Sequence, residues 1–226
     1  SKYGFSREEQ DAYAIESVTR AQAAQANGAF NDEIVAVTVN TRKGDVSIDQ
    51  DEQPTRSDVS RIPTLRPAFK KDGSVTAASS SSISDGAAAL VVLDADRAAA
   101  LGATPLARVV GHVTLSQEPE WFTTAPVGAI TKLLDKVGWS LQDVDLFEVN
   151  EAFAVVAMAP MRELGIDHKK LNVNGGACAL GHPIGASGAR LVVTLINALR
   201  TRGAKRGIAT LCIGGGEATA IAIELI

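Results

Sequence analysis

The spacing of apolar positions changes repeatedly along this chain between a helical period and short strand-like runs. A capping box at residues 6–9 precedes an alanine-rich run, which predicts a helix that ends near Asn27, with Gly28 as its left-handed stop. Further predicted helices cover residues 126–138, 150–164 and 187–200. Predicted strands cover residues 33–39, 105–115, 145–149, 171–174, 207–213 and 218–225. Strands that alternate with helices indicate an α/β fold.

Two segments do not fit this alternation cleanly. Residues 41–74 are polar and carry three prolines, so we expect a long irregular excursion, and loops of that length are usually functional or disordered. Residues 86–94, GAAALVVLD, predict either a helix that turns into a buried strand or a strand alone. The serines at 79–82 predict a loop or a helix lead-in.

Composition narrows the class of protein. The chain has 226 residues, 46% of them hydrophobic, which is enough for a substantial core, and a net charge of −4. A mild negative charge argues against a general nucleic-acid-binding or membrane-surface protein. No apolar stretch reaches membrane-span length, and the two cysteines give no disulfide framework. We therefore expect a cytoplasmic protein with reduced thiols.

The glycine-rich segment at residues 172–188 is the densest in candidate chemistry, and three hypotheses fit it. It could cradle a phosphate at the helix N-terminus that follows, although it has neither a Walker loop nor the dinucleotide-binding spacing. Cys178, His182 and Cys212 could bind a metal, although a fourth ligand is not evident. His182 lies between Gly181 and Pro183, so its ring could be aimed for proton transfer to a thiol.

Each candidate also has a purely structural interpretation. Cys178 lies between alanines, where a free cysteine is usually a small core residue. Asn150 stands between a strand and a helix, where a helix N-cap would explain it fully. His112 and His168 are isolated and read as structural. The basic cluster at residues 200–206 fits a solvated helix end.

Three segments taken together resemble the C-terminal signatures of the thiolase family. They are NEAFA from Asn150, NVNGGACALGHPIGASGAR from Asn172, and LCIGGGEATA from Leu211, in the family's order and separation. The stretches GFSREEQDAYAIES, FNDEIVAV, LRPAF and DGSVTAASSSSISDGAAAL are similar to that family's middle region. The resemblance covers essentially the whole chain.

The resemblance implies a thiolase-like α/β fold of two similar halves with an inserted loop domain. It also implies that this chain is the C-terminal portion, because the family's nucleophilic cysteine lies in a CGSG-like motif that the chain does not contain. Residues 1–75 would belong to the loop domain that covers coenzyme A. Residues 76–101 would be a remnant of the N-terminal half, and residues 102–226 the C-terminal domain.

The same resemblance assigns roles to four residues. His182 matches the histidine that draws the proton from the nucleophilic thiol, and Asn150 matches the residue that positions a water in the oxyanion site. Cys212 matches the second cysteine, which moves a proton on and off the substrate's α-carbon. The Gly214 N–H resembles a second oxyanion donor.

Contacts to coenzyme A are implied elsewhere in the chain. Ser81 aligns with a serine near the pantetheine, Phe153 with a position along the pantetheine tunnel, and Arg56 and Arg61 are candidates for the nucleotide phosphates. The chain departs from the family where it has Ser79, Ser82 and Ser84 in place of the usual Asn, Gly and Asn.

The implied activity is acyl-CoA C-acyltransfer: reversible condensation of two acetyl-CoA, or thiolytic cleavage of 3-ketoacyl-CoA. No cofactor or metal is expected, since coenzyme A thioesters are the substrates. The expected partners are the missing N-terminal half and further copies in a dimer or tetramer, with no nucleic acid or membrane. The alternatives are a degradative thiolase for longer chains and a non-catalytic fragment that binds coenzyme A or a partner. We expect the 226-residue chain alone to be inactive.

Overall fold

The computed structural model describes residues 2–226 as a mixed α/β arrangement, which confirms the predicted class. The helices are α1 (Arg7–Ala26), α2 (Glu52–Arg56), α3 (Ala95–Ala100), α4 (Ala125–Val137), α5 (Ala154–Leu164), α6 (Ala177–Leu180) and α7 (Ser187–Arg202). The strands are β1 (Val37–Thr41), β2 (Gly44–Ile48), β3 (Ala107–Ser116), β4 (Leu146–Val149), β5 (Arg206–Ile213) and β6 (Glu217–Leu225). Short 3₁₀ helices are η1 (Val59–Thr64), η2 (Pro119–Thr124), η3 (Leu141–Asp143) and η4 (His168–Lys170).

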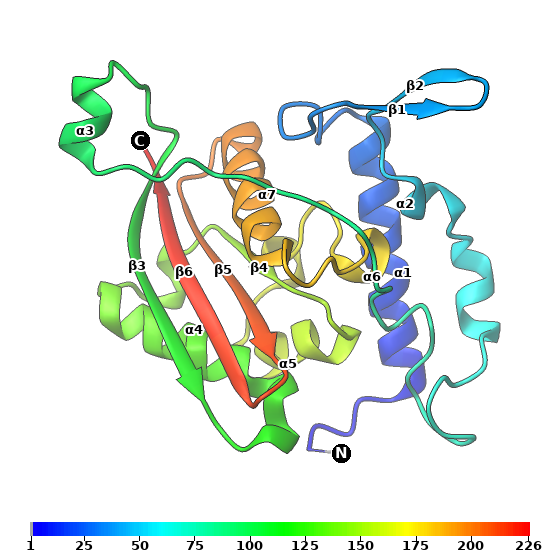
Figure 1. Ribbon diagram of the computed structural model, residues 1–226. Helices are drawn as coiled ribbons and strands as arrows, with labels where there is room; N and C mark the ends of the chain where they lie inside the picture. Colours follow the sequence, from blue (N-terminus) through cyan, green and yellow to red (C-terminus); the bar gives the residue numbers. More distant parts are fainter. Residues whose placement is uncertain (1) are drawn as a thin grey trace.

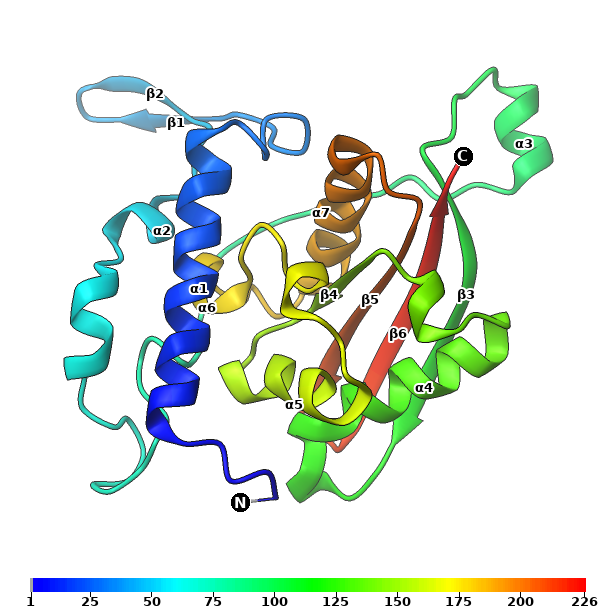
Figure 2. The same cartoon turned by 180° about the vertical axis from the view of Figure 1, so that it is seen from behind.

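A mixed four-stranded sheet in the order β3-β6-β5-β4 forms the centre of the molecule (Figure 1). The β3–β6 and β6–β5 pairs are antiparallel, and β5 and β4 run parallel. Helices α4 and α5 cover one face and α7 covers the other, as the two opposite views show (Figure 2). The strand pairing therefore brings the carboxyl ends of β4 and β5 to the same edge of the sheet.

Alternate side chains of β5 fill two separate cores. Ile208 and Cys212 pack in the layer with α4 and α5, whereas Ala209 and Leu211 pack against α7. This division follows from the period of two that a pleated strand imposes on its side chains. The position of Cys212 in the strand therefore places its side chain on the α4/α5 face.

Helix α1 begins and ends where the sequence predicts. Ser6 accepts a hydrogen bond from the Glu9 N–H, and the Glu9 carboxylate accepts one from the Ser6 N–H, which completes the capping box. The helix packs along α6 and α5 through buried residues spaced three or four apart: Tyr13, Ala14, Ser17, Val18, Ala21 and Ala24. Its buried stripe therefore faces the glycine-rich segment.

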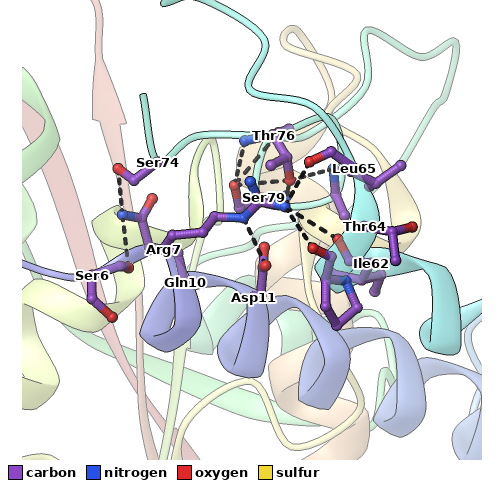
Figure 3. A network of polar contacts seen from close by, with 12 residues as sticks. Ser6, Arg7, Gln10, Asp11, Ile62, Thr64, Leu65, Ser74, Thr76 and Ser79 are labelled. Carbon is purple, nitrogen blue, oxygen red and sulfur yellow. Dashed lines mark hydrogen bonds and ion pairs between the residues drawn. The ribbon is translucent and has the colours of Figure 1, made fainter. Parts of the chain in front are cut away.

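The first turn of α1 also holds the excursion at residues 41–74 (Figure 3). Arg7 donates to the carbonyl of Leu65 at 2.8 Å and pairs with Asp11 at 2.7 Å, and Gln10 donates to Ser74 Oγ at 2.9 Å. The prediction of an irregular excursion is wrong in part, because the segment contains β2, α2 and η1. Asp51 and Asp58 cap α2 and η1 locally, which the proline-based interpretation overlooked.

The strand predicted at residues 33–39 is displaced. It begins at Val37 and pairs with β2 in a two-stranded hairpin whose residues are all exposed. The hairpin projects from the end of α1 away from the main sheet (Figure 1). β-Branched content signals an extended conformation and does not say which sheet the strand joins.

The prediction for residues 86–94 is wrong. The segment has neither helix nor strand, and Val91 is 89% exposed. It runs as irregular chain toward α3 (Figure 1). A strand needs a neighbour for its backbone N–H and C=O groups, and none of the strands among residues 2–226 pairs with this one.

Residues 171–174 likewise make only isolated bridges, such as Phe147 to Leu171, in place of the predicted strand. Asn172 has φ of +47°, which breaks an extended run. No helix within residues 2–226 combines the length and apolar character needed to cross a membrane.

Gly175 is the position where close approach matters most. Its φ is +81°, and a Cβ there would lie 2.5 Å from the Ser17 carbonyl oxygen and 2.9 Å from the Ala21 backbone nitrogen. Gly138, with φ of +68°, has open space around it. We predict that Gly138→Ala costs about 1 kcal/mol of unfolding free energy from backbone strain alone. Gly175→Ala should cost at least about 3 kcal/mol, because α1 must also move.

Urea unfolding of both variants measures the difference. Equal losses would show that α1 does not press against the glycine-rich segment in solution.

Candidate functional site

Asn150 and His182 meet at the carboxyl end of β4. The Asn150 N–H continues the ladder by donating to the Thr210 carbonyl at 3.0 Å, and its Nδ2 lies 3.3 Å from His182 Nε2. Helix α5 begins later, at Ala154, with Phe153 as its N-cap. The local interpretation of Asn150 as a helix cap is therefore wrong, and its side chain serves a long-range contact instead.

The backbone and ring of His182 are both held. Its N–H donates to the Ser82 carbonyl at 2.9 Å, and its Nδ1 lies 2.6 Å from Ser187 Oγ at the start of α7. Partial burial, with the charge of Arg190 nearby, lowers the pKa of His182 below its usual value. The ring is therefore neutral near pH 7 and able to accept a proton.

The serines that depart from the family pattern form contacts of their own beside His182. Ser82 Oγ lies 2.5 Å from Gln53 Nε2 and 2.9 Å from Ser84 Oγ. Ser79 Oγ accepts from the Thr76 N–H at 2.8 Å and is buried. A side chain at Gly181 would strike Ser84 and Gln53, so the chain needs glycine ahead of His182.

Glu151 is fully buried and is the acceptor at the centre of this region. Tyr13 and Ser17 of α1 donate to its two oxygens, each at 2.8 Å. Asn172 Nδ2 donates at 2.7 Å and the Cys178 N–H at 3.0 Å. No role for Glu151 was predicted from the sequence. A carboxylate directly after Asn150 and ahead of an apolar run does indicate a buried charge that needs hydrogen-bond donors.

Cys178 is a structural thiol, as its alanine neighbours predict. It is buried, and burial with the nearby Glu151 raises its pKa well above the usual value. Residues 2–226 contain no group of three His, Cys, Asp or Glu side chains placed to hold a metal, which removes the Cys178–His182–Cys212 hypothesis.

Two of the backbone donors that a phosphate cradle would use are already occupied at the start of α7. The N–H groups of Ala186 and Ser187 donate to the Pro183 carbonyl at 2.8 and 2.9 Å. An anion at this turn would have to displace those bonds.

Cys212 lies on β5 opposite Ala218 and is 7% exposed. Burial raises the pKa of its thiol to about 11, so it is protonated at neutral pH. Gly214, two residues on, has open space where a side chain would stand. Gly216 instead packs against the backbone of residues 117–119, so only this last glycine of the three is fixed by crowding.

The structure brings His182 to Asn150 and Ser187, and Cys212 to the same edge of the sheet. Within residues 2–226, no hydrogen bond joins Cys212 to His182 or Asn150. Parallel pairing of β4 with β5 still places Asn150 and Cys212 at neighbouring strand ends. The Cys212 thiol and the Asn150–His182 pair therefore lie at the same edge of the sheet without a hydrogen bond between them.

The four residues expected near coenzyme A divide into two pairs. The Ser81 N–H and Oγ both donate to the Ala152 carbonyl at 3.1 Å, and the Phe153 ring meets the exposed Phe69 edge-on, with centroids 6.1 Å apart. Both therefore flank the Asn150 turn. Arg56 pairs with exposed Glu52, and Arg61 is exposed on η1. No contact among the described residues ties either arginine to His182.

Behind Asn150, Glu148 is 1% exposed and lies 3.5 Å from Arg190 of α7. Burial outweighs the attraction of Arg190 and raises the pKa of Glu148 to about 8. Neither carboxyl oxygen has a hydrogen-bond partner among the described residues. Sequence analysis missed this pair, since nothing local links positions 148 and 190.

Known proteins match this chain over nearly its whole length. The family model for the thiolase C-terminal domain matches residues 103–225, and that for the thiolase N-terminal domain matches residues 1–96. An acetyl-CoA acetyltransferase of Chromobacterium violaceum is 52% identical over 99% of this chain and 58% of its own length. The chain thus spans little more than half of that relative.

Solved structures give the same result. The crystal structure of the Bacillus anthracis acetyl-CoA acetyltransferase superposes with a TM-score of 0.96 at 45% identity, covering all of this chain and 57% of its own. A thiolase from Ascaris suum in complex with coenzyme A gives 0.89 at 42% identity, with the same coverage. The expected thiolase-like fold is confirmed.

We predict that Glu151→Gln lowers the unfolding free energy by about 3 to 5 kcal/mol. The new amide would direct a donor at groups that already donate to this position. Glu120→Gln, an exposed position on η2, is the matched control and should stay within about 0.5 kcal/mol of the parent. Urea unfolding compares them, and a mild loss in Glu151→Gln would mean that the four contacts do not anchor α1.

We predict that Glu148 lowers stability as pH rises from about 5 to about 8, whereas His168 and His182, whose pKa values are lowered by burial, contribute in the opposite direction. Its raised pKa means that the folded state keeps a proton that the unfolded chain has released, so folding weakens by up to about 1.4 kcal/mol per pH unit. Glu148→Gln removes this titration, so the slope of stability against pH should become more positive than in the parent, while the other titrating groups remain. Unfolding titrations at several pH values measure both slopes, and identical slopes would contradict the assignment.

Proposed function

The chain belongs to the thiolase family, and on that premise we propose that it carries the acid–base groups of an acyl-CoA C-acyltransferase. The reaction would be reversible condensation of two acetyl-CoA to acetoacetyl-CoA and CoA, with thiolytic cleavage as its reverse. The relatives named acetyl-CoA acetyltransferase support this reaction class.

One observation carries the proposal: a neutral, immobilised imidazole faces an amide at the carboxyl edge of the sheet. His182 is held through Ser187 on one nitrogen and lies against Asn150 on the other. A general base must be unprotonated and held in a fixed orientation, and the lowered pKa of His182 and its two polar neighbours support that role. The same edge carries Cys212 and the open turn at Gly214.

The proposed acylation begins when His182 takes the proton from the nucleophilic thiol. The thiolate adds to the thioester carbonyl, His182 and a water on Asn150 stabilise the oxyanion, and the CoA thiolate leaves and regains a proton. Neither Cys178 nor Cys212 suits the nucleophile's part, since both are buried thiols with raised pKa values. The nucleophile therefore belongs to a part of the enzyme outside these 226 residues.

Cys212 would handle the proton on the α-carbon in the second half-reaction. In thiolysis the α-carbon leaves as an enolate and must gain a proton, and a thiol with pKa about 11 is protonated and ready to give it. In condensation the sequence runs backwards: Cys212 first releases its proton to solvent, and its thiolate then takes the proton from the α-carbon, which leaves the enolate. The Gly214 N–H would stabilise the enolate or its adduct, because no side chain blocks the approach.

The substrate contacts remain part of the proposal. Ser81 and Phe153 flank the Asn150 turn and would line the pantetheine path, with Arg56 and Arg61 toward the nucleotide phosphates. We propose no cofactor, a homo-oligomeric enzyme and a cytoplasmic location. The loop-domain boundary at residue 75 stays a prediction.

We predict that Cys212→Ser and His182→Ala fail at different steps when placed in the full-length product of the gene. His182→Ala should slow acylation by about a hundredfold or more, and alkaline pH should partly restore it. Cys212→Ser should acylate at a near-normal rate but lose condensation, because a serine hydroxyl is far too weak an acid. Stopped-flow acylation and steady-state condensation with CoA thioesters separate the two.

Cys178→Ala is the control for simple loss of a buried thiol and should keep both steps. Equal loss of acylation in His182→Ala and Cys212→Ser would show that the roles are assigned wrongly. Turnover by the 226-residue chain alone, with an acyl group trapped on Cys212, would overturn the proposal that the nucleophile lies elsewhere.

A further inference from the structure

Both ring nitrogens of His182 have polar neighbours, and with the Asn150 amide oriented as the structure has it, one placement of protons satisfies both contacts, while Asn150 Oδ1 has no partner among the described residues. Asn150 Nδ2, at 3.3 Å, can only donate, so Nε2 must offer its lone pair. The proton then sits on Nδ1 and is donated to Ser187 Oγ at 2.6 Å. The Ser187 hydroxyl donates its own hydrogen bond to the Pro183 carbonyl at 3.0 Å.

We propose that Ser187 is a positioning residue that fixes the Nδ1–H tautomer of His182 and so leaves Nε2 as the base. A neutral imidazole has two tautomers, and the hydrogen bond at one nitrogen decides which is present. No feature of the sequence analysis assigned Ser187 a part. It stood out only as the start of a predicted helix.

Ser187 is well placed to impose this choice. It is 1% exposed, it is the first residue of α7, and its hydroxyl points back to the carbonyl four residues earlier. Because its one proton goes to Pro183, its oxygen presents lone pairs to the imidazole. The ring is thereby fixed between β4 on one side and α7 on the other.

The charge on α7 works in the same direction. Burial lowers the pKa of His182, and the charge of Arg190, one turn after Ser187, lowers it further. It disfavours the doubly protonated ring before substrate arrives. Ser187 then selects which of the two neutral forms remains.

The catalytic consequence rests on the proposed function. When the nucleophilic thiol reacts, its S–H bond breaks and an Nε2–H bond forms, which leaves a thiolate and an imidazolium. The Nδ1–H group stays hydrogen-bonded to Ser187 throughout, and the Ser187 oxygen stabilises the positive charge of the imidazolium. A ring that already carried its proton on Nε2 could not accept the thiol's proton at that atom.

The test is a long-range ¹H–¹⁵N NMR spectrum of the chain labelled in its three histidines, which distinguishes protonated from unprotonated ring nitrogens. We expect His182 to show a protonated Nδ1 and an unprotonated Nε2 above its pKa. Ser187→Ala should move the ring to a mixture that contains the Nε2–H form. Ser187→Thr, which keeps the hydroxyl, should restore the single tautomer.

Thr201→Ala is the matched control on the same helix. Thr201 also donates to the carbonyl four residues earlier but lies a long way along α7 from His182, so its loss should leave the tautomer unchanged. The signals of His112 and His168 report whether each variant is folded. Should Ser187→Ala not fold, the parent spectrum still decides the question, because an Nε2–H ring there overturns the proposal.

The acylation rate of the full-length gene product tests whether the tautomer matters for catalysis. Ser187→Ala should lower the acylation rate about tenfold to a hundredfold, as loss of an orienting partner of a functional histidine commonly does, with rescue by Ser187→Thr. An unchanged tautomer in Ser187→Ala refutes the positioning role whatever the activity. A shifted tautomer in a protein without thiolase activity upholds that role and refutes the proposed function alone.

Discussion

The buried carboxylate of Glu151 is the constraint on which the remaining architecture depends. A fully buried charge is costly unless its oxygens are satisfied, and here two hydroxyls, an amide and a backbone N–H all donate to it. Those donors come from α1, from Asn172 and from α6. One side chain therefore ties together segments that lie more than a hundred residues apart in the chain.

This anchor determines how the rest of the site is built. With α1 held against it, the glycine-rich segment has room only for hydrogen at Gly175 and Gly176, where a side chain would strike α1 or Glu151 itself. The segment then leads through α6 to Gly181, whose positive φ aims His182 back at the end of β4. Glu151 is also the neighbour of Asn150, so the same turn supplies the anchor and the partner of the imidazole. The close packing that holds the fold thus also sets the distance between the two polar groups.

How far the sequence predicts the molecule depends on the range of each interaction. The Ser6 capping box, the left-handed Gly28 and the buried run at 146–149 are local signals, and the structure contains each of them. The immediate neighbours of Asn150 predict a helix cap, but the partner of its side chain is 32 positions away. Residues 86–94 have the composition of a strand, but no strand among residues 2–226 pairs with them. The roles of Glu151, Glu148 and Ser187 depend on neighbours from other elements, which local sequence does not indicate. The thiolase signatures contain the candidate residues, whereas the contacts among those residues follow only from the fold.

Native-state hydrogen exchange tests the central claim most directly. The Cys178 N–H donates to Glu151 and the Gly176 N–H to Ser17, so both amides report on the anchor. If α1 and the glycine-rich segment are one unit, these amides and those of Val18 and Ala21 should open with free energies that agree within about 0.5 kcal/mol. Glu151→Gln should lower all four together. If the opening free energies of the Gly176 and Cys178 amides are several kcal/mol lower than those of the α1 amides, the account is contradicted. His182 would then lie on a segment that moves independently of Glu151.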